Sequence, residues 1–103
     1  MKSIWKFPLD VVGRQTVSVP KGAKFLSAAM QGDTLCAWAE VKTSAEHVEI
    51  PIFIFGTGHS IPRVLAGPND TIILAEDLKF LATAHHPRLQ LVWHIYVPRE
   101  CAY

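Results

Sequence analysis

The sequence predicts an all-β domain, a small antiparallel sandwich or open barrel of about seven or eight short strands. Hydrophobic residues recur with a period of two along most of the chain, which is typical of strands with one buried face. Gly and Pro residues interrupt this pattern at short intervals, and no long helical pattern, repeat or linker emerges. The 103 residues, 50% of them hydrophobic, suffice for a single β domain over residues 1–103.

The first two predicted strands cover residues 4–9 and 14–19. Alternate residues of the first strand, beginning with Trp5, form its apolar face. In the second strand, the corresponding face consists of Gln15, Val17 and Val19. We expect the chain to turn between them near Gly13.

A hairpin is predicted next, with strands over residues 24–30 and 34–41 and its tip at Gly32. The alanines in this region would also support a helix over residues 23–30. However, only about eight residues separate the flanking breakers, and no capping box precedes them. We therefore expect a strand.

A polar loop over residues 42–46 leads into a predicted strand over residues 48–55. Pro51 interrupts this strand, and because proline has no amide to donate to a ladder, we expect an edge strand or a bulge there. The strand ends at the glycine-containing loop 56–60.

Residues 60–77 form a long connection with several Gly and Pro residues and one possible short strand at residues 71–74. The strongest pattern follows it, with strands over residues 78–85 and 89–97. We expect them to form a final hairpin around residues 86–88.

Composition disfavours several classes of protein. Lys and Arg number 10 and Asp and Glu 9, so the formal net charge of +1 provides no general attraction to duplex nucleic acid or to anionic lipid. No apolar stretch approaches the roughly 20 residues of a membrane helix, so we expect no membrane association. Charged residues make up only 18% of the chain, and this apolar excess favours a homo-oligomer.

The cysteines and the first residues point to the cytosol. Only Cys36 and Cys101 are present, too few for the disulfide framework of a small secreted domain. Residues 1–8 lack the apolar region and cleavage site of a signal peptide. Cys36 lies in an apolar alternation, where a buried packing role is the better account.

The most unusual stretch for chemistry is Gly56, Thr57, Gly58, His59 and Ser60. Two glycines allow backbone amides to converge while a hydroxyl and an imidazole project from the same loop, which would suit a phosphate or another anion. The spacing does not match a P-loop, and no helix pattern follows. The alternative is a tight turn that only closes the preceding strand.

A second group of polar residues, His85, His86 and Arg88, lies at the tip of the final hairpin. These side chains would suit an anionic ligand or a metal. Because successive strand residues point to opposite faces and no further ligand lies at zinc spacing, an exposed turn is the favoured interpretation, and no metal site is predicted.

The residues do not predict an enzyme. Ser60 and His59 are adjacent in sequence, which rarely aligns a nucleophile with its base. No pair of acidic residues has a spacing that predicts a general acid and base, and no cofactor motif is present. Most aromatic residues should pack in the core, with one or two exposed for stacking on a base or for a subunit interface.

Residues 4–9 (IWKFPL), 14–23 (RQTVSVPKGA), 53–59 (FIFGTGH) and 91–97 (LVWHIYV) resemble a family of small uncharacterised phage and prophage proteins. That family carries a domain of unknown function. The sequence departs from the family pattern in a longer connection over residues 61–77. The resemblance implies a setting in the cytosol of a bacterial host.

Small phage proteins without catalytic motifs often inhibit host machinery, and the resemblance therefore implies an anti-defence role. The leading hypothesis is sequestration of a small anionic ligand, such as a nucleotide immune signal, with loop 56–60 as the phosphate site and charge partners among Arg14, Arg63, His86 and Arg88. An alternative is an inhibitor or interaction module that docks on a host or phage protein. An enzyme acting on a phosphoester is the weakest of the three hypotheses.

Overall fold

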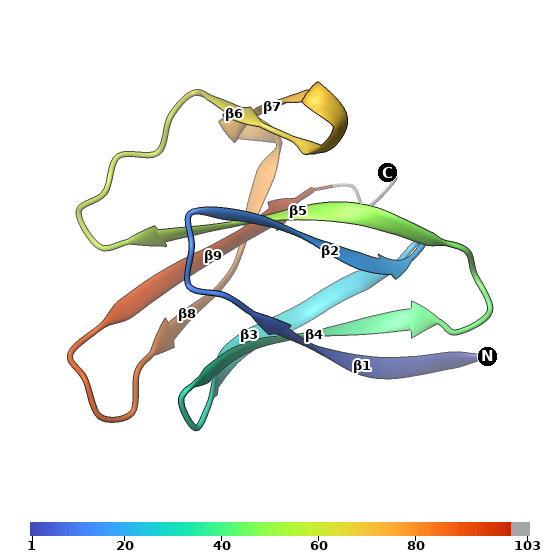
Figure 1. Ribbon diagram of the computed structural model, residues 1–103, viewed down its shortest axis with the longest axis horizontal. Helices are drawn as coiled ribbons and strands as arrows, with labels where there is room; N and C mark the ends of the chain where they lie inside the picture. Colours follow the sequence, from blue (N-terminus) through green and yellow to red (C-terminus); the bar gives the residue numbers. More distant parts are fainter. Residues whose placement is uncertain (100–103) are drawn as a thin grey trace.

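The computed structural model describes residues 1–99, and the predicted features of the tail, Cys101 among them, lie outside the described residues. Over these residues the fold is all-β, as predicted, with nine strands in three antiparallel sheets. Two larger sheets face each other across a shared core, and a small third sheet covers part of the outside (Figure 1). Within the described residues the sheets do not close into a barrel, which is consistent with the predicted small antiparallel sandwich or open barrel.

The three-stranded sheet has the order β1 (Lys2–Leu9), β4 (Thr34–Lys42) and β3 (Lys24–Gln31). The β3–β4 hairpin and its tip at Gly32 are confirmed, and Gly32 has a φ of 62°, which a residue without a Cβ adopts readily. The alternative helix over residues 23–30 is not formed, because residues 24–31 pair antiparallel with β4, with one register shift between Phe25 and Ser27.

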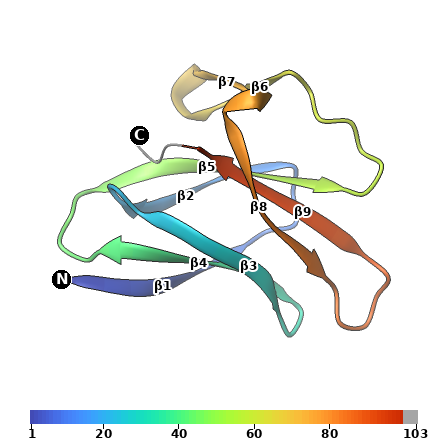
Figure 2. The ribbon, with the colours of Figure 1, turned by 180° about the vertical axis from the view of Figure 1, so that it is seen from behind.

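The four-stranded sheet has the order β2 (Arg14–Pro20), β5 (His47–Gly56), β9 (Val92–Pro98) and β8 (Leu78–His85). The consecutive strands β1 and β2 therefore lie in different sheets. At the edges opposite β1 and β2, the strands β3 and β8 lie next to each other (Figure 2).

Pro51 lies in β5, which is a central strand by sheet order. In its first half, however, β5 pairs only with β2, because β9 pairs only with residues 53–56. Pro51 is thus in an edge-like half of a central strand, which accommodates a residue without an amide donor.

The core between the two larger sheets contains one row of side chains from each strand. Ile50 and Ile52 of β5 and Ile95 of β9 are fully buried there. Phe25 of β3 and Val41 of β4 meet them from the opposite sheet. At about 25 cal/mol per Å² of apolar surface, this shared burial is the main stabilising contribution to the fold.

The long connection contains more structure than the sequence indicated. The predicted short strand is β7 (Ile72–Leu74), and it pairs with β6 (Val64–Ala66). Two single 3-10 turns, η1 (Pro68–Asp70) and η2 (Ala75–Asp77), flank β7. The β6–β7 hairpin lies over the outer face of the four-stranded sheet (Figure 1).

The final hairpin is confirmed, but its second strand begins three residues later than predicted, at Val92. Residues 86–91 form the turn, and the backbone amides of Arg88 and Leu89 both donate to Nδ1 of His86 at 3.1 Å. These two amides therefore do not pair with β8. Leu89 and Leu91, which were predicted on a strand face, are exposed.

Cys36 is buried, as predicted, but on the outward row of β4 that also carries Trp38. The ammonium of Lys6 on β1 donates to the side-chain oxygen of Gln31 on β3 at 2.7 Å. The register places Cys36 between these two residues. The hydrogen bond between Lys6 and Gln31 therefore crosses β4 above the thiol of Cys36.

Candidate functional site

The outer face of the four-stranded sheet carries a row of four side chains, one from each strand. Arg14 of β2 lies opposite Phe53 of β5, Phe53 lies opposite Tyr96 of β9, and Tyr96 lies opposite Phe80 of β8. The β6–β7 hairpin covers Phe53, which is 1% exposed, whereas Phe80 at the end of the row is 53% exposed. The row is thus covered at Phe53 and open at its Phe80 end.

An aromatic cluster forms where this row becomes exposed. The rings of Phe55 and Phe80 lie on Tyr96 with centroid separations of 5.8 Å and 5.7 Å, each edge to face at 72°. This is a favourable arrangement for aromatic pairs. The three rings, called the aromatic cluster below, have one exposed margin at Phe80.

A chain of hydrogen bonds lies beside the aromatic cluster. His94, which pairs with Phe55 across β5 and β9, contacts the Thr57 hydroxyl through Nε2 at 2.9 Å and the Thr83 hydroxyl through Nδ1 at 3.0 Å. Because a neutral imidazole has one N–H, one threonine accepts from the ring and the other donates to it. The chain ties loop 56–60 to the outer face of the sheet.

Loop 56–60 is a tight turn with the His59 ring folded back over Gly56. The His59 amide donates to the Gly56 carbonyl at 3.1 Å, and the Gly56 amide donates to Nδ1 of His59 at 3.2 Å. A Cβ at Gly56 would lie 2.9 Å from Cε1 of His59, so glycine permits this approach. Gly58 has a φ of 87°, which favours glycine for conformational reasons.

These contacts determine which donors of the loop can bind a ligand. Two of its amides, those of Gly56 and His59, are used inside the turn. The amides of Thr57, Gly58 and Ser60 make no hydrogen bond within residues 1–99. Because His59 accepts at Nδ1, its remaining proton lies on Nε2, and the exposed ring presents a further N–H donor.

Arg14 lies on the same face as this loop but at the far end of the row. Three strand spacings, about 14 Å, separate it from Phe80. Its side chain is exposed, and the preceding residue, Gly13, accepts a hydrogen bond from the Ile54 amide at 3.1 Å. This bond fixes the backbone before Arg14 against β5.

His86 and Arg88 contact Asp33 in the β3–β4 turn. Nε2 of His86 lies 3.5 Å from Oδ1 of Asp33, and Arg88 forms an ion pair with the other oxygen. The His86 side chain is only 10% exposed and packs edge to face on Trp93 at 6.2 Å. These two predicted charge partners connect two turns instead of joining loop 56–60.

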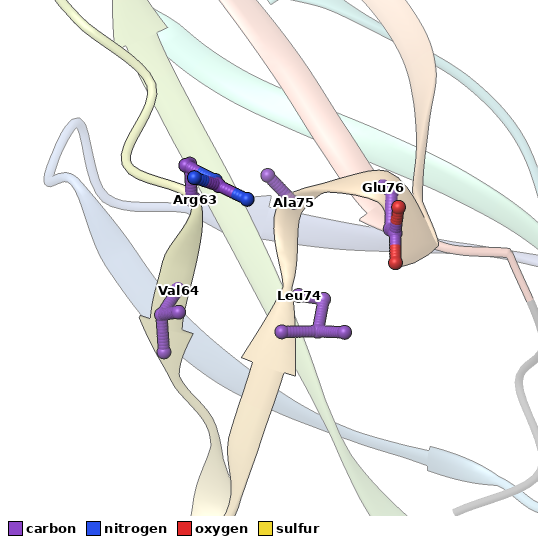
Figure 3. A pocket seen from close by; sticks show the side chains of 5 residues that line it. All are labelled: Arg63, Val64, Leu74, Ala75 and Glu76. Atoms are coloured by element: carbon purple, nitrogen blue, oxygen red, sulfur yellow. The ribbon is translucent and has the colours of Figure 1, made fainter.

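Arg63 lies at the start of the β6–β7 hairpin, where it lines a hollow of ≈ 410 Å³ together with Val64, Leu74, Ala75 and Glu76 (Figure 3). The Arg63 carbonyl accepts a hydrogen bond from the Ala75 amide at 2.9 Å. The predicted site residues are thus distributed over three places, and loop 56–60 and Arg14 share the outer face of the sheet.

Sequence reasoning did not assign His94 or Thr83 to a site. It expected one or two exposed aromatic residues without singling out Tyr96, Phe80 or Phe55. The alternation of β9 separates His94 and Tyr96 from the core residues, which is a detectable signal. Their partners on β5 and β8 depend on strand order and register, which the alternation does not provide.

The arrangement is suited to binding. A partly exposed aromatic cluster can stack on a planar ring, and adjacent amides and an imidazole can donate to an anion. Within residues 1–99, no group of three or more His, Cys, Asp or Glu side chains is placed to hold a metal ion. The same residues include no helix with the length and apolarity required to span a bilayer.

The fold and this face define a small all-β domain with a mixed aromatic and polar surface on one sheet. A family model described as a domain of unknown function (DUF7352) matches residues 1–102, and the chain belongs to this family. No match was found among curated proteins or among solved structures.

Proposed function

We propose that the protein binds and sequesters a small anionic ligand of the nucleotide class, without catalysis. The observation that carries this proposal is the position of loop 56–60 beside the aromatic cluster, with the Thr57–His94 hydrogen bond between them. A nucleotide combines a planar base with an anionic phosphate, and these two features match the two parts of the face. We call the loop and the cluster together the binding face.

The base would stack at the exposed margin of the aromatic cluster. Phe80 is 53% exposed and is held by Tyr96, so a ring placed on it would remove further apolar surface from water. Stacking of a base on an aromatic side chain contributes about 1–3 kcal/mol. This contribution requires no rearrangement of the core, because Phe80 projects from the outer face.

The phosphate would bind at loop 56–60. The amides of Thr57, Gly58 and Ser60 and Nε2 of His59 are the donors that the internal contacts of the turn do not use. Arg14 provides the cation on the same face for an extended ligand. His86 and Arg88 are not part of this proposed site, because Asp33 already partners both.

The biological role we propose is that of a phage-encoded anti-defence protein in the bacterial cytosol. The resemblance to small phage and prophage proteins that we infer from residues 4–9, 14–23, 53–59 and 91–97 is the basis for this setting. Sequestration of an immune nucleotide requires affinity and a stable fold but no catalytic group, which is consistent with the chemistry of the binding face.

The alternative function, docking on a host or phage protein, is favoured by the open edge of β1, where Ile4 is 61% exposed. The same strand carries Lys2, Lys6 and Pro8 beside Ile4. Lysine and proline on an edge discourage the addition of a further strand. The binding face therefore supports the ligand proposal better than this edge supports docking.

The test is a thermal-shift screen of the purified protein against linear nucleotides, cyclic nucleotides and ADP-ribose derivatives. A ligand at about 100 times its Kd stabilises a protein by roughly 2.7 kcal/mol, which raises the Tm of a domain of this size by more than about 10 °C. Selective stabilisation by one nucleotide class is the expected result. The absence of a shift across the panel would contradict the proposal and favour docking.

Matched variants locate the site. Phe80→Ala and His59→Ala should each reduce the nucleotide-induced shift. Ile4→Ala, an exposed apolar residue on the other sheet, and His47→Ala, an exposed histidine at the far end of β5, should preserve it. An equal loss in all four variants would count against the binding face.

A further inference from the structure

The β6–β7 hairpin is apolar on both of its faces. Its strands read Val-Leu-Ala over residues 64–66 and Ile-Ile-Leu over residues 72–74. The inward pair is Leu65 and Ile73, which pack against Phe53 of the four-stranded sheet. This contact accounts for one face of the hairpin.

The other face of the hairpin projects into solvent. The register pairs Val64 with Leu74 and Ala66 with Ile72, and the alternation of strands places these pairs opposite the inward pair. Val64 is 55%, Leu74 41% and Ile72 72% exposed. Antiparallel strands with one solvated face usually carry polar residues there, whereas continuous apolar runs are typical of strands covered on both faces.

Two opposite charges flank this apolar face. Arg63 and Glu76 both line the hollow of ≈ 410 Å³ between Val64 and Leu74 (Figure 3). In the part of the chain from residue 1 to 99, neither side chain forms an ion pair. The face therefore has an apolar centre with a cation and an anion at its margin.

We propose that a second copy of this chain covers the outward face of the β6–β7 hairpin, around a two-fold axis. Such an axis places Arg63 of each copy against the partner's Glu76, and it packs Val64, Leu74 and Ile72 against their equivalents. A surface that carries both charges is complementary to itself under this symmetry. The formal net charge of +1 per chain opposes the association only weakly.

The two-fold arrangement leaves the binding face open. The exposed margin of the aromatic cluster is at Phe80 on β8, whereas the proposed interface is on the outward side of β6 and β7. The proposal is therefore independent of the proposed ligand. A dimer that binds no nucleotide would support the interface and contradict the proposed function. A monomer that binds nucleotide would do the reverse.

Sedimentation velocity of the full chain tests the interface. Wild-type protein at about 100 μM should sediment as a dimer, since a modest specific interface has a Kd in the micromolar range or below. Ile72→Asp should convert it to a monomer, because the aspartate would be buried without a partner. The control Ile4→Asp, at another strongly exposed isoleucine, on β1, should remain dimeric.

Charge reversal at Arg63 and Glu76 is the decisive experiment. Arg63→Glu and Glu76→Arg should each weaken dimerisation by about tenfold or more through like-charge contacts, and the double variant should recover the wild-type Kd to within about threefold. Far-UV circular dichroism of each variant shows whether it is folded. A monomeric wild type, a dimer that neither single variant weakens, or a double variant without recovery would each overturn the proposal.

Discussion

The two faces of the four-stranded sheet use the same strands for different purposes. On the inner face, Ile50, Ile52 and Ile95 are 0% exposed and meet only other apolar side chains. On the outer face, the same strands β5 and β9 present an aromatic cluster and a histidine bonded to two threonines. Because strand residues alternate between faces, substitutions on one face can change stability while those on the other change binding.

The largest expected effect is on the inner face. Ile52→Ala should lower the free energy of unfolding by about 2–5 kcal/mol, because it leaves a cavity at a fully buried position. Phe80→Ala on the outer face should cost about 1 kcal/mol, mainly the contact with Tyr96. Urea unfolding of both variants measures the contrast. Equal losses would mean that the two faces are not separable.

The second prediction sharpens the contrast within loop 56–60. Gly58→Ala should cost about 1–2 kcal/mol of stability, because alanine is strained at a φ of 87°. Gly56→Ala should cost less, because its Cβ meets only the exposed His59 ring, which can turn away. It should instead displace that ring, visible as a shift of the His59 ring protons in NMR spectra. An unmoved ring in a folded Gly56→Ala variant would contradict the described turn.

The third prediction concerns the hydrogen bond between loop and sheet. Thr57→Val keeps the shape of the side chain but removes the hydroxyl that contacts His94 at 2.9 Å. We expect a loss of about 1 kcal/mol and faster amide hydrogen exchange across residues 56–60. Thr16→Val, an exposed threonine on the same face, is the control. Similar exchange in both variants would show that the Thr57–His94 contact does not hold the loop.

The smallest expected effect is at the two connected turns. Asp33→Asn weakens the ion pair with Arg88 and removes a charge beside His86, and an exposed ion pair contributes about 0.2–1 kcal/mol. We expect a small decrease in the urea midpoint and no change in any nucleotide-induced thermal shift. A loss of nucleotide binding in a folded Asp33→Asn variant would move the site from loop 56–60 to these turns.

Alternation in the sequence was sufficient for the main elements of the fold. It predicted the β3–β4 hairpin, the strand interrupted by Pro51 and the final hairpin, because each is a local pattern with turn residues at its end. It did not predict β6, whose three residues are too few to show a period. Nor did it predict the late start of β9, which depends on the His86 ring accepting two amides.

The candidate site was harder to predict from the sequence than the fold. Loop 56–60 was identified from its glycines, but the inward fold of His59 is a contact that no spacing indicates. The position of His86 and Arg88 against Asp33 brings together turns from two different hairpins. The aromatic cluster requires the strand order β5–β9–β8, because its rings come from three strands. Such non-local pairings depend on the fold as a whole.

The most direct measurement is a two-dimensional amide NMR titration with the nucleotide that gives the largest thermal shift. We expect shift changes at Thr57, Gly58 and Phe80, with Ile4 on the other sheet unaffected. Changes centred on Asp33 and residues 86–91, or no localised changes at saturation, would contradict the assignment of ligand binding to the outer face of the four-stranded sheet.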